Sequence, residues 1–555
     1  MFSLHRAHPV RTYRPRFQVL EDRTLLSTCV VDHLADDGGG SGLNGSLRYC
    51  ITHAVDGDTI TFGVTGTINL TGALPDLYHN ISINGPGPNL LTVRRDTGGN
   101  YDIFTVGATV AISGLTIANG FVSYGGDGGG IFNYGQLTVS SYTISQNHAR
   151  YGGGIRNDGT LTISNSTIAG NTATGPGGVG NTEGLGGGIY NFGTMTVSNS
   201  TVSANSGACG FYGGGVGGIY NQDRATLTVS NSTISGNTAG PASGVGGIGN
   251  HGTLTLSNST ISHNQTYIVG GIYNCYGATL TMSNSTIAHH EEEEGIVSDG
   301  TLNMRNSIVA DNYPDFEGHL SLSGYNLIGY AFGDSGFVDT DLVGTFDNPI
   351  DPMLGPLQNH GGPTQTMALL GGSPALNAGD PAQLGVADQR GVVRTGGVNI
   401  GAYQASASAF VLTAPATVAA GTPFDVTVKA VDIFGQTAVG YTGTVTFNTS
   451  DRCPGVVLPA AYAFTASDQG THTFSSGFTL MTPGDQTITA TDAAGGFSAS
   501  TVVTLQGAGP APGRQPSRDP DAALDLVFAG LGDVGLAPSI DFLPDSVSPG
   551  RRDRN

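Results

Sequence analysis

Residues 153–168 read Gly-Gly-Ile-Arg-Asn-Asp-Gly-Thr-Leu-Thr-Ile-Ser-Asn-Ser-Thr-Ile, and the expected architecture follows from this stretch. A Gly-Gly-Ile-x-Asn motif opens it, and a Ser-Asn-Ser-Thr-Ile motif closes it. Variants of this pair recur from about residue 130 to 310 at intervals of about 24 residues, which lengthen to as many as 34 where loops are inserted. Such a period predicts stacked repeats, because one unit of this size cannot bury its apolar face alone.

Two columns of apolar residues run through these repeats. The stretches between them alternate, as in Leu161-Thr-Ile163, so each unit predicts three short strands with Gly and Asn corners. Inward residues would stack on their equivalents at ~4.8 Å. We therefore predict an all-β fold, a right-handed parallel β-helix (solenoid). The columns are Ile131, Ile155, Ile189, Ile219, Ile248, Ile272 and Ile296, then Ile144, Ile168, Val202, Ile234, Ile261, Ile287 and Ile308.

Asparagines form columns of their own. One follows each first-column isoleucine by two residues, and another follows most second-column residues by three. Because Asn tolerates left-handed backbone angles and its amide can bond an equivalent amide in the next unit, we predict structural ladders at the corners. The Asn-Ser-Thr triplets at Asn165, Asn199 and Asn231 also match a glycosylation sequon, which we weigh below the structural role.

Composition excludes some classes of protein. The 555 residues include 89 glycines, only 11% are charged, and the formal net charge is −21, with Lys429 the single lysine. Without a cationic surface the chain is no nucleic-acid binder. Nowhere do 18 apolar residues follow one another, so we expect no transmembrane helix. This balance is typical of a secreted or cell-surface protein.

The five cysteines are scattered and include no Cys-x-x-Cys pair, so neither a zinc cage nor a redox motif is present. Cys29 and Cys50 lie near the start of the predicted solenoid and could close a loop there. Unpaired, buried thiols remain the alternative. The others are Cys209, Cys275 and Cys453.

The repeats resemble the GGAI and FxxN repeats of chlamydial polymorphic membrane proteins and the wider pectate-lyase-like β-helix superfamily. The resemblance covers residues 28–404, with 28–315 as the β-helix proper. That superfamily includes polysaccharide lyases and hydrolases, which implies that an enzyme must be considered. Residues 351–403, from Asp351-Pro-Met-Leu-Gly-Pro-Leu357 to Ile400-Gly-Ala-Tyr403, resemble the choice-of-anchor Q domain, so we expect C-terminal rungs and a cap over 316–404.

The remaining segments differ in character. Residues 405–505 carry period-two runs such as Tyr441-Thr-Gly-Thr-Val-Thr-Phe447, which predict a β-sandwich and resemble immunoglobulin-like modules of bacterial surface proteins. Residues 1–27 end in Leu20-Glu-Asp-Arg-Thr-Leu-Leu-Ser27 and resemble the N-terminal segment of extracellular planctomycete proteins, which implies an export segment. It lacks an apolar stretch of signal-peptide length. Residues 506–555, rich in Pro, Gly and Asp, are predicted to be a disordered tail.

Ionisable residues are sparse in the repeats. Lyases of this superfamily need a basic residue beside an acidic calcium site, and hydrolases need paired carboxylates. The charged residues between 129 and 289 do not stack into a cluster, so we assign no catalytic residue. They are Arg150, Arg156, Asp158, Glu183, Asp223 and Arg224.

Two features remain as candidate binding sites. His263 and His289 occupy equivalent positions in adjacent units, and His290 and Glu291 follow, so imidazoles and carboxylates could bind a divalent metal. The alternative is a solvated charge run in a corner loop, without a cofactor.

The second feature is a row of aromatic residues beside the inward isoleucines. They would point outward and either bind sugar rings or a partner surface, or stack on one another under loops for stability. They are Phe132, Tyr134, Tyr190, Phe192, Tyr220 and Tyr273. One corner nearby expands in three consecutive units, as at 172–188, and insertions clustered on one edge of a solenoid often bind ligands.

From these observations we predict a non-catalytic, exported surface protein that acts in adhesion or cell-envelope structure. The partner would be a polysaccharide or a surface protein. The alternative is a carbohydrate-active β-helix enzyme, a polysaccharide lyase or hydrolase, or a carbohydrate-binding protein that uses the aromatic row.

Overall fold

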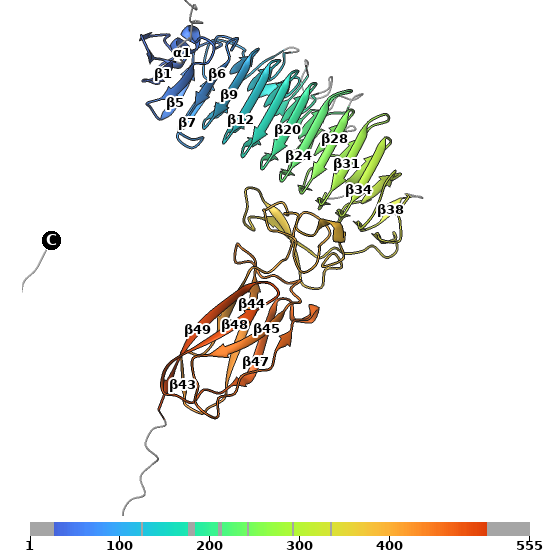
Figure 1. Cartoon of the computed structure of the whole chain (residues 1–555). Coiled ribbons are helices and arrows are strands. Elements are labelled where there is room, and N and C mark those ends of the chain that lie inside the picture. The colour runs from blue at the N-terminus through green and yellow to red at the C-terminus, as the bar shows by residue number, and fades with distance from the viewer. Residues whose placement is uncertain are drawn as a thin grey trace, which may run out of the picture. The chain divides into compact units, whose positions relative to one another are not determined.

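The structure, a computed structural model, describes residues 27–123, 126–175, 184–208, 214–240, 244–290, 293–332 and 336–507. Three long sheets of 13, 12 and 10 strands, here sheets A, B and C, dominate it (Figure 1). From β8 to β35 the chain visits sheets C, A and B in turn, and almost every strand pairs in parallel with its equivalents in the turns before and after. The fold is the predicted right-handed parallel β-helix.

The strands are short, as the repeat predicts. Sheet A contains β1 (Thr28–Val31), β2 (Gly40–Ser41), β3 (Asn44–Gly45), β4 (Thr59–Phe62), β6 (Ile81–Asn84), β9 (Thr109–Ser113), β12 (Gln136–Ser140), β16 (Thr160–Ser164), β20 (Thr194–Ser198), β24 (Thr226–Ser230), β28 (Thr253–Ser257), β31 (Thr279–Ser283) and β34 (Thr301–Arg305). Sheet B contains β5 (Gly66–Leu70), β7 (Leu91–Arg95), β10 (Thr116–Ala118), β13 (Thr143–Ser145), β17 (Thr167–Ala169), β21 (Thr201–Ser203), β25 (Thr233–Ser235), β29 (Thr260–Ser262), β32 (Thr286–Ala288), β35 (Ile308–Ala310), β37 (Leu327–Ile328) and β39 (Leu342–Val343).

Sheet C and a smaller fourth sheet complete the coil. Sheet C contains β8 (Phe104–Val106), β11 (Ile131–Asn133), β15 (Ile155–Asn157), β19 (Ile189–Asn191), β23 (Ile219–Asn221), β27 (Ile248–Asn250), β30 (Val269–Asn274), β33 (Glu294–Ser298), β36 (Phe316–Gly318) and β38 (Ala331–Phe332). The expanded corner forms a four-stranded sheet of β14 (His148–Ala149), β18 (Thr172–Ala173), β22 (Ser206–Gly207) and β26 (Thr238–Ala239). Much of the inserted sequence at this corner lies outside the described residues.

The predicted apolar columns form the core, with one correction. Ile287 pairs with Val309, which takes the inward position, whereas Ile308 pairs with Thr286 and lies on the outer face of sheet B under residues 351–404. Ile155 pairs in register with Ile131 on one side and Ile189 on the other, and all three side chains are fully buried. Ile168 is equally buried in the second column. Each such side chain contributes on the order of 1.5–3 kcal/mol through its removal from water.

The predicted asparagine ladders are confirmed. In sheet C, Asn133 Nδ2 donates to Asn157 Oδ1 (2.6 Å), and Asn157 donates in the same way to Asn191 (2.8 Å). At the corner after sheet B, Asn147 donates to Asn171 Oδ1 (2.9 Å). These amides are buried, so the ladders satisfy polar groups that would otherwise lose their hydrogen bonds to water.

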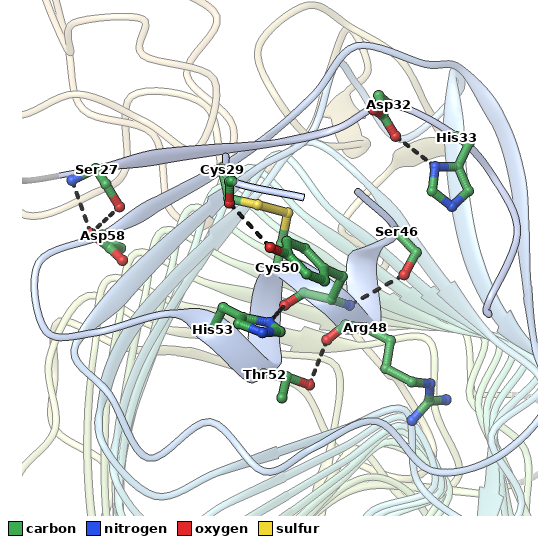
Figure 2. The surroundings of a disulfide bond; sticks show 12 residues. Ser27, Cys29, Asp32, His33, Ser46, Arg48, Cys50, Thr52, His53 and Asp58 are labelled. Carbon is green, nitrogen blue, oxygen red and sulfur yellow. Dashed lines mark hydrogen bonds and ion pairs between the residues drawn. A yellow bond between two sulfur atoms is a disulfide. The ribbon is translucent and has the colours of Figure 1, made fainter. Parts of the chain in front are cut away.

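The N-terminal end of the solenoid carries α1 (Leu47–His53) and a disulfide between Cys29 and Cys50 (Figure 2). Ser46 caps the helix, since its Oγ accepts a hydrogen bond from the Tyr49 amide (3.2 Å). The disulfide joins β1 to the helix, which confirms the prediction that Cys29 and Cys50 could close a loop. Cys275 and Cys453 are free thiols, and Cys209 lies outside the described residues.

Residues 351–404, here the cover segment, fold back onto the outer face of sheet B. They contain β40 (Leu354–Gln358), β41 (Thr366–Leu369) and η1 (Pro381–Gln383). Leu369, Ala375 and Ile400 pack against Ile308 and Leu327 of the sheet. The predicted 316–404 segment thus first adds rungs at β36 to β39 and then covers one face of the solenoid.

Residues 409–506 form two sheets around a shared apolar core that includes Val426, Val428 and Ile488. One sheet contains β42 (Ala409–Thr413), β44 (Phe424–Val431) and β47 (Thr471–Phe478). The other contains β43 (Thr417–Ala419), β49 (Phe497–Gln506), β48 (Gly484–Asp492), β45 (Thr444–Thr449) and β46 (Tyr462–Ala463), and η2 (Ala466–Asp468) precedes β47. This is the expected β-sandwich; its immunoglobulin-like character stays a prediction. The export segment, up to residue 26, and the tail from residue 508 lie outside the described residues.

Candidate functional site

The aromatic row lies where the repeat places it, on the outer side of sheet C. Phe132, Arg156, Tyr190 and Tyr220 pair in register from β11 to β23, and Gly249 and Tyr273 continue the row. Tyr190 and Tyr220 stack, with ring centroids 5.2 Å apart. The rungs therefore do align the rings along the solenoid.

The middle of this row is buried. Tyr190 and Tyr220 are only 8% and 9% exposed, because Leu185, Val216 and Val245 from the corner loops pack over them. Burial raises the pKa of Tyr190 to about 12. These two rings belong to a satellite apolar cluster, which is the stabilising role weighed for the row.

The aromatic residues just after the strands of the row are more open. Tyr134 is 41% exposed and Phe192 is 53% exposed. Phe132 is half-buried against Tyr134, with ring centroids 5.5 Å apart, and Tyr273 donates from its hydroxyl to Asp299 Oδ2 (2.8 Å). Tyr134 and Phe192 are therefore the most exposed of the six predicted residues, although the Tyr134 ring also packs beside Gly107.

Arg156 connects the charges and the rings of this surface. Its guanidinium donates two hydrogen bonds to Asp158 (2.8 and 2.9 Å) and pairs with Asp127. It also lies 5.6 Å from the ring centroids of both Phe132 and Tyr190. Asp158 thus holds the cation that lies between the rings.

The histidine pair is also aligned. His263 and His289 both adopt left-handed backbone angles, at φ 53° and 57°, and their rings stack with centroids 5.6 Å apart. His289 Nε2 lies 3.6 Å from a carboxylate oxygen of Asp311, which occupies the same position in the next rung. Burial raises the pKa of Asp311. His289 and Asp311 line a cavity of about 450 Å³ together with Asp351 and Met353.

His290 takes a different role from its neighbours. It occupies the corner asparagine column, where its Nδ1 accepts the Asn264 amide (3.1 Å), and its own amide donates to Asn312 Oδ1 (3.1 Å). Complete burial lowers its pKa to about 3, so the ring is neutral at physiological pH. A neutral imidazole thus replaces an asparagine in the ladder.

The proposed metal set is therefore only partly assembled. The structure brings His263 and His289 together and directs His290 into the ladder, and Glu291 lies outside the described residues. Throughout the described ranges, no three His, Cys, Asp or Glu side chains are grouped closely enough to hold a metal ion. Metal binding stays a prediction that the histidine pair alone does not support.

A further surface lies at the corner between sheets A and B. Asn165, Asn199, Asn231 and Asn258, here the asparagine strip, all adopt left-handed angles, with φ between 45° and 49°. They belong to the Ser-Asn-Ser-Thr motifs. With Pro363, Val386 and Gly391 of the cover segment they line a cavity of about 360 Å³.

Sequence reasoning placed structural duties on these asparagines and missed the cavity. The motif shows the corner, but the opposite wall comes from residues more than 100 positions later in the chain. No local sequence pattern indicates that these distant residues lie opposite the asparagines.

Comparison with known proteins adds little to this description. No protein-family model matches the chain, and no curated protein matches it. Among solved structures, the chain is similar to the crystal structure of pectate lyase Pel9A, with 14% sequence identity and a TM-score of 0.42. The alignment covers 68% of this chain and 97% of the lyase. A likeness at this level says nothing about activity, and the β-helix itself rests on the strand pairing described above.

Proposed function

We propose that this protein is an exported surface protein that acts without catalysis, in adhesion or in cell-envelope structure. The observation that carries the proposal is the use of its charged groups in structural contacts. Arg156 is paired with Asp127 and Asp158, and Arg390 is buried between Asp388 and Asp432. Charges held in this way position rings and loops and are not free to transfer protons.

Export is supported by the disulfide. Cys29 and Cys50 are 21 residues apart and join β1 to α1 at the start of the solenoid (Figure 2). Structural disulfides persist in oxidising compartments and are rare in the cytosol. No helix in the described parts of the chain is long and apolar enough to cross a membrane.

A carbohydrate-binding protein is the second candidate, and the exposed rings of Tyr134 and Phe192 favour it. Both lie at the corner between sheets C and A, directly after β11 and β19. Aromatic faces commonly supply contact area for sugar rings. This role is compatible with adhesion.

Two measurements test the proposal. The purified full-length chain is incubated with acidic and neutral polysaccharides, with and without calcium, and the products are assayed for unsaturated ends and new reducing ends. We expect neither, and either product would overturn the non-catalytic role. In parallel, native cells are fractionated and probed with an antibody, and we expect the chain at the surface or in the medium. A purely cytoplasmic chain would overturn export.

A further inference from the structure

The asparagine strip is part of a longer column whose other half already binds polypeptide. Asn284 and Asn306 continue the column in the next two rungs, at φ 50° each. Asn284 Nδ2 donates to the side-chain carbonyl of Gln383 (2.9 Å). Asn306 donates to the Asn399 carbonyl (3.1 Å) and accepts from the Asp380 amide (2.8 Å). In this half, the amides of the column hold the cover segment.

In the other half the same amides face the cavity. Within the described residues, the side-chain amides of Asn165, Asn199, Asn231 and Asn258 make no hydrogen bond to the protein. Asn258 Oδ1 is shielded from solvent and still lacks a partner. Shielded polar atoms in folded proteins are mostly hydrogen-bonded, so Asn258 Oδ1 is an acceptor that a donor group in the cavity could use.

The cavity is polar but electrically neutral. Asp388 and Arg390 line it, yet their side chains are fully buried and paired with each other at 2.9 Å. Its exposed apolar wall includes Val386, which is 39% exposed, and Pro363. A ligand there meets amides that both donate and accept hydrogen bonds, with an apolar surface opposite.

The spacing of the amides narrows the class of ligand. Successive rungs place equivalent groups ~4.8 Å apart, whereas side chains on one face of an extended peptide repeat at roughly 6.8 Å. One pyranose unit of an extended linear glycan is close in length to one rung. Sugar hydroxyls also donate and accept, and sugar rings carry an apolar face that suits Val386.

We propose that the asparagine strip binds a neutral, linear glycan that lies along the solenoid axis in this cavity. Each amide would bond hydroxyls of one sugar unit, and the side chains of the cover segment would contact the ring faces. The site is separate from the aromatic row on sheet C. This proposal rests on the proposed non-catalytic function, because it takes the glycan to be bound and not cleaved.

The experiment uses the full-length protein and isothermal titration calorimetry with xylohexaose and cellohexaose. Hexagalacturonate and a synthetic peptide of residues 377–386 serve as the acidic and polypeptide probes. The variant Asn199→Gly/Asn231→Gly removes two amides, and glycine tolerates the left-handed angles of both positions. Gln146→Gly is the matched control, because it removes an exposed amide at φ 57° from another corner.

We expect a neutral hexasaccharide to bind the wild type and the control equally, and the double variant about tenfold or more weakly. Val386→Trp, which fills the cavity, should weaken binding even if the glycine variant folds poorly. The inference is wrong if neither neutral sugar binds, or if the double variant binds as tightly as the wild type. Tighter binding of hexagalacturonate or of the peptide would also overturn it. A hexasaccharide that binds and is recovered shortened would instead overturn the non-catalytic function and leave the binding site standing.

Discussion

The tripeptide Thr-Ile-Ser occurs in β13 and again in β25, in two different environments. In β13, Thr143 and Ser145 are half-buried, whereas Thr233 and Ser235 in β25 are buried. The difference is the cover segment, which reaches Thr233, Thr260 and Thr286 through hydrogen bonds. Identical strands therefore form an open face in one half of the solenoid and an interface in the other.

This comparison shows how the solenoid presents its surface. The inward isoleucine is equivalent in both halves, so the core is uniform. The outward threonine suits either environment, because its hydroxyl bonds water when exposed and can bond the cover segment when buried. The asparagine column divides two rungs later than the threonines. The side chains of Asn284 and Asn306 bind the cover segment, whereas those of Asn231 and Asn258 line the cavity although Thr233 and Thr260 of the same rungs are covered.

The largest expected effect comes from the core that both halves share. Ile219→Asp places a carboxylate between Ile189 and Ile248, all of which are fully buried. Because the charge cannot be solvated there, we expect a loss of at least about 4 kcal/mol and melting of several rungs. Thermal unfolding followed by circular dichroism measures it. A variant that melts like the wild type would show that the rungs are not stabilised as one core.

The next largest effect should appear only in the half of the solenoid that the cover segment contacts. Gln389 is buried in the cover segment, where its side chain bonds Thr260, Thr233 and the Ser232 carbonyl. We expect Gln389→Ala to cost about 2–3 kcal/mol, because the buried groups it leaves lose their partners.

Hydrogen exchange provides the readout for this variant. Amides of β25 and β29 should lose protection, while those of β13 and β17 keep theirs. Gln136→Ala, an exposed residue of β12, is the control. Equal loss of protection in both halves would contradict a cover that acts locally.

A smaller effect tests the identical tripeptides directly. Thr233 donates from its hydroxyl to the Gln365 carbonyl (2.6 Å) and accepts from Gln389 Nε2 (3.0 Å). We expect Thr233→Val to destabilise the protein by about 1–2 kcal/mol and Thr143→Val to stay within about 0.5 kcal/mol. Chemical denaturation of both variants measures the difference. Similar costs at both positions would remove the distinction between the halves.

The smallest effect concerns pH. Burial, with a contribution from the charge of Glu317, raises the pKa of Glu294 in β33 to about 7. Because the folded state holds this proton more tightly than the unfolded chain, stability should fall as pH rises from about 4.5 to 7. Melting temperature, measured across this pH range, follows the effect. Glu294→Gln should make the fall in melting temperature smaller by about 1 °C. Asp223→Asn is the control, because Asp223 lies in an exposed ion pair. An unchanged pH profile would show that Glu294 does not titrate in this range.

Much of the solenoid could be predicted because its information is local and repeated. The isoleucine columns, the asparagine ladders and the alignment of His263 with His289 all follow from the period, since residues at equivalent positions must stack. The period does not say what covers a rung. Tyr190 and Tyr220 were predicted to point outward, and they do, yet loop residues bury them.

The candidate sites show the same limit. His290 is one residue beyond a stacked histidine, and its position in the asparagine column explains why it enters the ladder. The cavity at the asparagine strip is closed by a chain segment distant in sequence, so no sequence motif predicts it.

The repeat alone is sufficient to specify the coil, its core and its polar ladders, because inward packing and corner geometry are short-range and recur in every unit. Which outward faces stay open depends on the cover segment, which crosses sheet B from more than 100 residues away. Its hydrogen bonds are made to threonines and asparagines that recur in other rungs, and its apolar side chains pack on Ile308 and Leu327. Long-range packing therefore determines where this protein can bind, and the repeat determines the surface on which binding takes place.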